Sequence, residues 1–192
     1  MREWIINNFV HVLAVLILIS RIGDIGSTWI VSPTLKLESN LLVRKLGWPF
    51  AFFSLLLCLV PYLDPAASLI VLVASLLVTS SNLSKAWFVR AMGEEEYSYL
   101  MFQMARRANF GFVVLSIWGS AFFVLLAGAV LVFLAPDPNN DWAFWFGMGI
   151  ITYGAAMLIH GSLAYFKLFR KIRQLDRIEK QGPFSAFDDQ VE

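Results

Sequence analysis

Residues 110–134 read FGFVVLSIWGSAFFVLLAGAVLVFL, an apolar stretch without a single charged side chain. About 20 such residues are enough to cross the hydrocarbon core of a bilayer as an α-helix. The whole chain of 192 residues is 58% hydrophobic and only 15% charged, whereas soluble domains usually carry about 25% charged residues. The sequence therefore predicts an integral membrane protein.

Further apolar segments flank this stretch, and together they predict an all-α polytopic bundle of about five transmembrane helices. We expect spans at residues 9–32, 48–63, 66–89, 110–134 and 142–166. The first lacks a small-residue cleavage site and is interpreted as a retained span. The second is short and contains Pro61, so we expect it to be irregular. Residues 1–166 then form the membrane domain.

Two further helices are expected outside the spans. Residues 94–108 begin with three glutamates and carry two arginines just before Ala108. An apolar stripe recurs at helical spacing, made of Tyr97, Leu100, Met101, Met104 and Ala108. These features predict an amphipathic helix at the membrane surface, or alternatively an extension of the fourth span. Residues 167–180 predict a basic cytoplasmic helix that Gly182 and Pro183 end, and residues 184–192 form the tail.

The distribution of basic residues predicts the orientation, because lysine and arginine accumulate in cytoplasmic loops. The connections after the first and third spans and the C-terminal segment are basic, whereas those after the second and fourth contain no Lys or Arg. We therefore expect a multi-pass protein of a bacterial cytoplasmic (inner) membrane, with its N-terminus outside and its C-terminus in the cytoplasm.

Polar residues gather in the cytoplasmic halves of the predicted spans, where an unpaired charge costs at least about 2.5–3.5 kcal/mol. Arg21 and Asp24 share one face of the first span, so they can partly neutralise each other. Two interpretations compete, namely hydrogen-bonded glue between helices and a pocket open to the cytoplasm. The sequence favours the pocket for Arg21, Asp24 and Glu38, and glue for Ser80, Ser81, Asn82 and Asn109. The candidate ligand-binding set is Arg21, Asp24, Thr28, Glu38, Asn40, Asn82, Lys85 and His160.

Several chemistries find no support in the sequence. His11 and His160 are expected near opposite faces, so they cannot ligate one metal ion or haem together. The single cysteine, Cys58, lies in an apolar run, and no HExxH, CxxC or P-loop pattern occurs. We predict no catalytic set, metal or cofactor, and no nucleic-acid partner.

Residues 24–48 contain Asp24-x-x-x-Thr28, then Glu38-x-Asn40-x-Leu42, and then Arg44 and Gly47-Trp48. This pattern resembles the signature of a family of small prokaryotic membrane proteins known only as a domain of unknown function. The chain departs from that signature at Leu41, where the family usually has proline. The resemblance implies that Asp24, Thr28, Glu38 and Asn40 work together, and it implies no reaction.

Three functions remain open from the sequence. The first is a non-catalytic accessory or structural subunit of a membrane complex, which associates with other subunits or with itself through small residues such as Ser116 and Ser120. The second is a small transporter or ligand-binding protein that uses the polar pocket. The third is a lipid-modifying membrane enzyme with Asp24, Glu38 and His160 as acid–base candidates.

The basic helix adds a candidate lipid interaction. Basic residues beside a membrane attract anionic lipid at about 1 kcal/mol each. The candidate lipid-binding residues are Lys167, Arg170, Lys171, Arg173 and Arg177. Alternatively, these residues only determine the orientation of the chain.

Overall fold

The computed structural model describes residues 8–38, 41–135 and 142–181, and this part of the chain is helical without strands. Four helices are long and apolar enough to cross a membrane. They are α2 (Phe9–Val31), α5 (Pro65–Met92), α7 (Phe110–Leu134) and α8 (Trp142–Gln181). The all-α membrane-type bundle predicted from the sequence is thereby confirmed.

The predicted second span consists of two short pieces. Helix α4 (Trp48–Phe53) continues directly into a 3₁₀-helix, η1 (Ser54–Tyr62), which contains Pro61 as expected for an irregular segment. A 3₁₀-helix rises about 2.0 Å per residue and an α-helix about 1.5 Å. The two pieces together therefore extend about 27 Å, against about 22 Å for a purely α-helical segment. The 3₁₀ geometry brings this short segment close to the thickness of a hydrocarbon core of about 30 Å.

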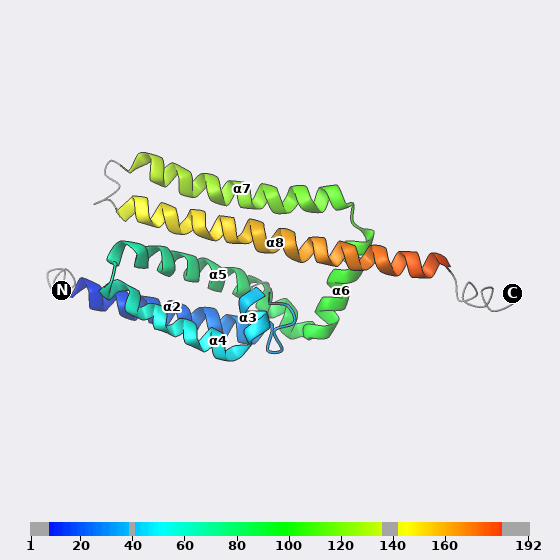
Figure 1. Cartoon of the computed structure of the whole chain (residues 1–192), viewed down its shortest axis with the longest axis horizontal. Coiled ribbons are helices and arrows are strands. Elements are labelled where there is room, and N and C mark those ends of the chain that lie inside the picture. Colours follow the sequence, from blue (N-terminus) through cyan, green and yellow to red (C-terminus); the bar gives the residue numbers. More distant parts are fainter. Residues whose placement is uncertain (1–7, 39–40, 136–141, 182–192) are drawn as a thin grey trace, which may run out of the picture.

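The long helices form an open row, and Figure 1 shows them lying side by side. Helix α7 packs on α8, α8 on α5, and α5 on α2, while η1 packs on the other side of α2. Helix α7 is consequently an edge helix, and only Ala121 and Gly128 of its residues are buried. The face of α7 that points away from α8 is available to lipid or to another protein.

Glycines set the closest helix contacts in this row. A methyl group added at Gly128 of α7 would lie 2.8 Å from the carbonyl oxygen of Gly147 on α8, and the converse distance is also 2.8 Å. A methyl group at Gly149 of α8 would lie 2.8 Å from Cβ of Val73 on α5. Close approach through small residues is typical of membrane helices, since it maximises van der Waals contact between backbones.

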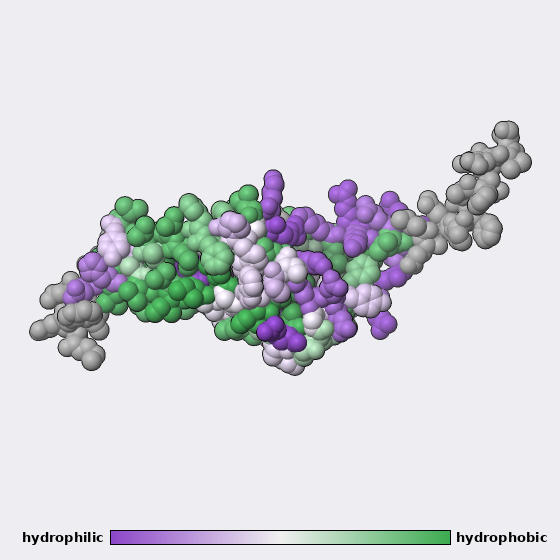
Figure 2. Space-filling view, turned by 90° about the horizontal axis from the view of Figure 1, so that it is seen from below, coloured by the Kyte–Doolittle hydropathy of each residue, from purple (hydrophilic) through white to green (hydrophobic). Residues whose placement is uncertain are grey.

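One end of the row holds α3 (Leu41–Leu46), α6 (Glu94–Arg107) and the last part of α8, and we name it the basic end. All lysines and arginines of the described residues except Arg21 lie there. Figure 2 shows hydrophilic residues gathered towards this end and hydrophobic ones over the rest of the visible face. The opposite end carries the turn at Leu63, where Asp64 caps α5 by accepting hydrogen bonds from the amides of Ala66 and Ala67.

Helix α6 confirms the predicted amphipathic helix, but it is not an extension of the fourth span. Extended backbone at Ala108 and Asn109 separates it from α7, and Asn109 caps α7 by accepting a hydrogen bond from the amide of Gly111 instead of joining helices. Side chains outside the predicted apolar stripe of α6 pack on α8. Ala105 is buried with Phe169 and Ile172 of α8, whereas Met104 is exposed.

Candidate functional site: a polar cluster around Arg21

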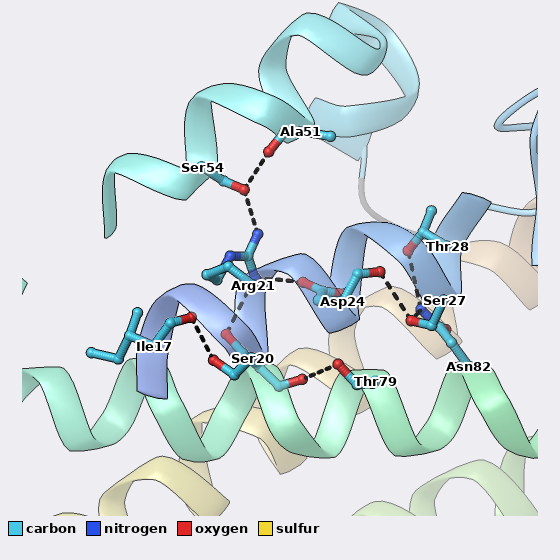
Figure 3. Close-up of polar contacts among 11 residues, drawn as sticks. Ile17, Ser20, Arg21, Asp24, Ser27, Thr28, Ala51, Ser54, Thr79 and Asn82 are labelled. Atoms are coloured by element: carbon cyan, nitrogen blue, oxygen red, sulfur yellow. Dashed lines mark hydrogen bonds and ion pairs between the residues drawn. The ribbon is translucent and has the colours of Figure 1, made fainter. Parts of the chain in front are cut away.

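Arg21 occupies the interface of three helical segments, as Figure 3 shows. Its Nη1 donates to Oδ2 of Asp24 at 2.5 Å and to Oγ of Ser75 on α5 at 3.3 Å. Its Nη2 donates to Oγ of Ser54 on η1 at 2.5 Å. The side chains of Arg21 and Asp24 are only 16% and 14% exposed. The predicted ion pair is therefore present, and hydroxyls from both neighbouring helices complete its hydrogen bonding.

The short second span places Ser54 where Arg21 can reach it. Ser54 is the first residue of η1 and donates its own hydroxyl proton to the carbonyl oxygen of Ala51, one turn back in α4. Its oxygen is thereby oriented to accept from the guanidinium group. Among the described residues, Nε of Arg21 is the one guanidinium nitrogen that is buried without a hydrogen-bond partner.

Asp24 and Glu38 are also brought together, as the pocket interpretation requires. Glu38 belongs to the connection after α2, and its carboxylate is close enough to that of Asp24 for the two to interact electrostatically. Two acidic groups thus share the surroundings of one arginine. Such an arrangement can hold a proton or a small cationic or polar group, because an excess carboxylate favours positive charge nearby.

Thr28 and Asn82 link α2 to α5 through a hydrogen bond. The Nδ2 atom of Asn82 donates to Oγ1 of Thr28 at 3.1 Å and to Oγ of Ser27 at 3.3 Å. Ser27 in turn donates to the backbone oxygen of Asp24 at 2.9 Å, so this network touches the Arg21 cluster. The glue interpretation holds for Asn82, whereas Ser80 is exposed and Ser81 receives a bond from Ser84 in its own helix.

The remaining members of the candidate pocket lie elsewhere. Lys85 is exposed on α5, and Asn40 lies outside the described residues. His160 is on α8, which packs mainly on α7 and α5 and meets α2 at the first residues of both helices, where the ring centres of Phe9 and Trp142 lie 4.7 Å apart. Among the described residues, its buried Nδ1 atom has no hydrogen-bond partner. The predicted cluster is therefore smaller than expected, because α8 contacts α2 near the starts of both helices, at Phe9 and Trp142.

Glu94 has a role that the sequence did not indicate. Its carboxylate accepts hydrogen bonds from the hydroxyls of Ser32 at 2.6 Å and Thr34 at 2.7 Å, and from the amides of Thr34 and Lys36 at 3.3 and 3.2 Å. Desolvation acts to raise the pKa of Glu94, but these hydrogen bonds outweigh it and hold the pKa below its ordinary value. Glu94 thus fastens the connection after α2 to the start of α6, which positions Glu38.

The basic helix is a direct continuation of α8, as predicted. Some apolar side chains of this segment are buried within the protein, because Phe169 and Ile172 pack against α6. Arg106 of α6 forms an ion pair of 2.8 Å with Asp176 of α8. The five candidate lipid-binding residues are all exposed; they are Lys167, Arg170, Lys171, Arg173 and Arg177.

Sequence reasoning missed Ser54 and Ser75 as partners of Arg21. Ser54 was detectable, since it is the one polar residue among the apolar residues 48–60. Ser75 lies within the predicted span at residues 66–89; in the structure it is buried and accepts a hydrogen bond from Arg21. Among the described residues, no group of three or more His, Cys, Asp or Glu side chains is arranged to hold a metal ion.

The row of apolar helices defines the chain as a multi-pass helical membrane protein. Comparison with protein-family models, with curated proteins and with solved structures finds no match to any of them. The resemblance drawn from residues 24–48 thus stays a prediction; two residues of that pattern, Asp24 and Glu38, interact electrostatically.

Proposed function

We propose that this chain is a non-catalytic accessory subunit of a membrane complex in the bacterial cytoplasmic membrane, and that it docks through α7. The observation that carries this proposal is the edge position of α7, which packs on α8 alone among the long helices. In this helix Phe112, Phe123 and Phe133 are exposed by 70% or more. Ser116 and Ser120, one helical turn apart, are exposed as well.

The physical basis is the chemistry of helix association in lipid. Hydrophobicity does not drive one helix onto another there, so contact depends on small residues and on shape. Gly119 lies between the two serines, and a methyl group added to it would meet nothing within 4 Å. The Ser116–Ser120 strip is therefore shallow, and the neighbouring phenylalanines can enclose a partner helix.

Photo-crosslinking tests the docking proposal. A benzoylphenylalanine at Phe123 of α7 should crosslink to one defined protein, or to a second copy, in native membranes. The control position is Ile19 of α2, which is comparably exposed at 60% against 70% for Phe123 and should capture lipid only. Lipid alone at both positions, together with migration as a lone monomer in mild detergent, would contradict the proposal. Equal protein capture at both positions would contradict docking through α7.

The proposed orientation places the basic end in the cytoplasm and the N-terminus outside, following the positive-inside tendency. It is tested with single cysteines in a Cys58→Ser background. A cysteine at Leu63, which is 87% exposed at the opposite end, should react with an impermeant maleimide on intact cells. A cysteine at Ser98 of α6, also exposed, should react only after permeabilisation. Labelling of both on intact cells would refute this orientation.

A second candidate function is binding or transport of a small polar ligand at the Arg21 cluster. The observation in its favour is the ion pair of Arg21 and Asp24, with a second acidic group, Glu38, near enough to interact electrostatically with Asp24. A thermal-shift screen of small polar metabolites should then find a compound that stabilises the wild type and not Asp24→Asn. A screen without such a compound, or with equal stabilisation of both proteins, would count against this function.

A further inference from the structure

We infer that the groove between the start of α7 and the basic part of α8 is a discrete binding site for an anionic phospholipid. The groove has a volume of about 450 Å³ and is lined by Phe110, Phe166, Phe169, Arg170 and Arg173. This volume falls within the range of about 300–1,000 Å³ that is usual for ligand sites. The inference requires only that the helices span a membrane, so it does not depend on the docking proposal.

The positive charge at the groove indicates which lipid headgroup it binds. Arg170 and Arg173 are one turn apart on α8 and exposed. Within the described part of the chain, neither forms an ion pair with a carboxylate, whereas Arg106 nearby does. The guanidinium carbon of Arg173 lies 5.7 Å from the centre of the Phe110 ring, which holds this side chain over the groove. Two arginines without acidic partners match a phosphate, which guanidinium groups bind in bidentate fashion.

The apolar surface of the same two helices indicates the rest of the ligand. Phe110 and Phe166 also line a shallow surface depression, together with Trp118 and Ser162, and this depression encloses no space for a separate molecule. Trp118 follows Phe110 by eight residues, and Ser162 precedes Arg170 by eight, so both lie about 12 Å deeper along their helices. That depth is within one leaflet of a core about 30 Å thick. An acyl chain can lie along the helix surface in this direction, whereas free phosphate uses only the arginine end.

Trp118 offers a direct readout, because it lines this depression and is 54% exposed. The protein is reconstituted in phosphatidylcholine nanodiscs that contain small amounts of either phosphatidylglycerol or phosphatidylcholine brominated at mid-chain. Bromine quenches tryptophan on contact. The part of the quenching due to Trp118 is the difference between the wild type and Trp118→Phe.

Brominated phosphatidylglycerol should quench Trp118 at a lower mole fraction than brominated phosphatidylcholine. The double variant Arg170→Gln and Arg173→Gln should lose this preference by about 30-fold, since each basic residue near the surface contributes a factor of about five. The matched control is Lys167→Gln with Lys171→Gln, which removes the same charge from α8 outside the groove and should keep most of the preference.

Three results would overturn the inference. Equal quenching by the two brominated lipids would exclude a preference for the anionic headgroup. An equal loss in the control variant would show diffuse attraction by the helix instead of a site. Unchanged phosphatidylglycerol quenching in the double arginine variant would show that Arg170 and Arg173 do not hold the lipid, and would leave the groove for an acidic segment of a partner protein.

Discussion

The energetic coupling between Arg21 and Asp24 is the most direct test of the candidate site. The perturbations are Arg21→Met, Asp24→Asn and the double variant. Each single change leaves one charged group in an interface that is less than a fifth exposed. A lone charge at the centre of a membrane helix costs about 2.5–3.5 kcal/mol on insertion scales, and breaking a buried pair generally costs about 3–5 kcal/mol.

The surroundings of Arg21 and Asp24 reduce these free-energy costs. In Asp24→Asn, the guanidinium group of Arg21 keeps the hydroxyls of Ser54 and Ser75 as acceptors. In Arg21→Met, the carboxylate of Asp24 can take up a proton. We therefore expect each single variant to lose about 2 kcal/mol of unfolding free energy. The double variant carries no unpaired charge and should lose only about 1 kcal/mol, which is about 3 kcal/mol less than the sum of the single effects.

The assay is unfolding in mixed micelles with increasing dodecyl sulfate, followed by tryptophan fluorescence. The control cycle uses Lys36→Gln and Glu95→Gln, because that ion pair of 2.8 Å has side chains 56% and 84% exposed and should couple by less than about 1 kcal/mol. Additivity of the Arg21 and Asp24 changes within about 0.5 kcal/mol would refute our account of the cluster. Equal coupling in the two cycles would refute the role assigned to burial.

Three other predictions use the same preparation. Gly128→Ala should destabilise the fold by about 1–3 kcal/mol, because the new methyl group must push α7 away from α8. The control is Gly119→Ala, whose methyl group meets nothing within 4 Å and should change stability by less than about 0.5 kcal/mol. Equal effects of the two changes would refute the glycine contact. Asn82→Ala should cost about 0.6–1.7 kcal/mol in the same titration, as expected for hydrogen bonds between membrane helices, and no measurable cost would refute the glue interpretation. Folding lowers the pKa of Glu94 below its ordinary value of 4.5, so the contribution of Glu94 to stability is complete above pH 4.5 and is lost as the pH falls below it. Amide exchange of residues 32–37 should therefore accelerate at low pH. In Glu94→Gln this exchange should be fast at all pH values.

The spans were predictable because lipid imposes a simple length requirement on apolar segments. Residues 110–134 were expected as a span, and α7 has those bounds. The ion pair of Arg21 and Asp24 was predictable from spacing within one helix. The hydrogen-bond partners of Arg21 on other helices were not predictable, because they depend on which helices are neighbours. His160 shows this plainly, since the row places its helix beside α5 and α7 and away from the Arg21 cluster.

The face of α6 that packs on the protein could not be predicted from the sequence either. Its charges predicted both of its ends, but the face that packs inwards depends on where α8 lies. Glu94 illustrates the same limit at one residue. Helix N-termini favour acidic residues in general, so three consecutive glutamates gave no reason to prefer one. Only the path of residues 32–37 shows that Glu94 receives their hydrogen bonds while Glu95 pairs with Lys36.

The order of the helices in the row follows from their polarity. Helix α2 carries the ion pair of Arg21 and Asp24, and it is covered by η1 on one side and α5 on the other, so hydroxyls can reach the charges from both sides. Helix α7 is the most apolar of the four long helices and lies at the edge, where lipid can solvate it without polar partners. Exchanging these two positions would expose a guanidinium group to hydrocarbon. The cost of that exposure is the physical reason why the polar cluster and the α7 edge lie on opposite sides of the α5–α8 contact.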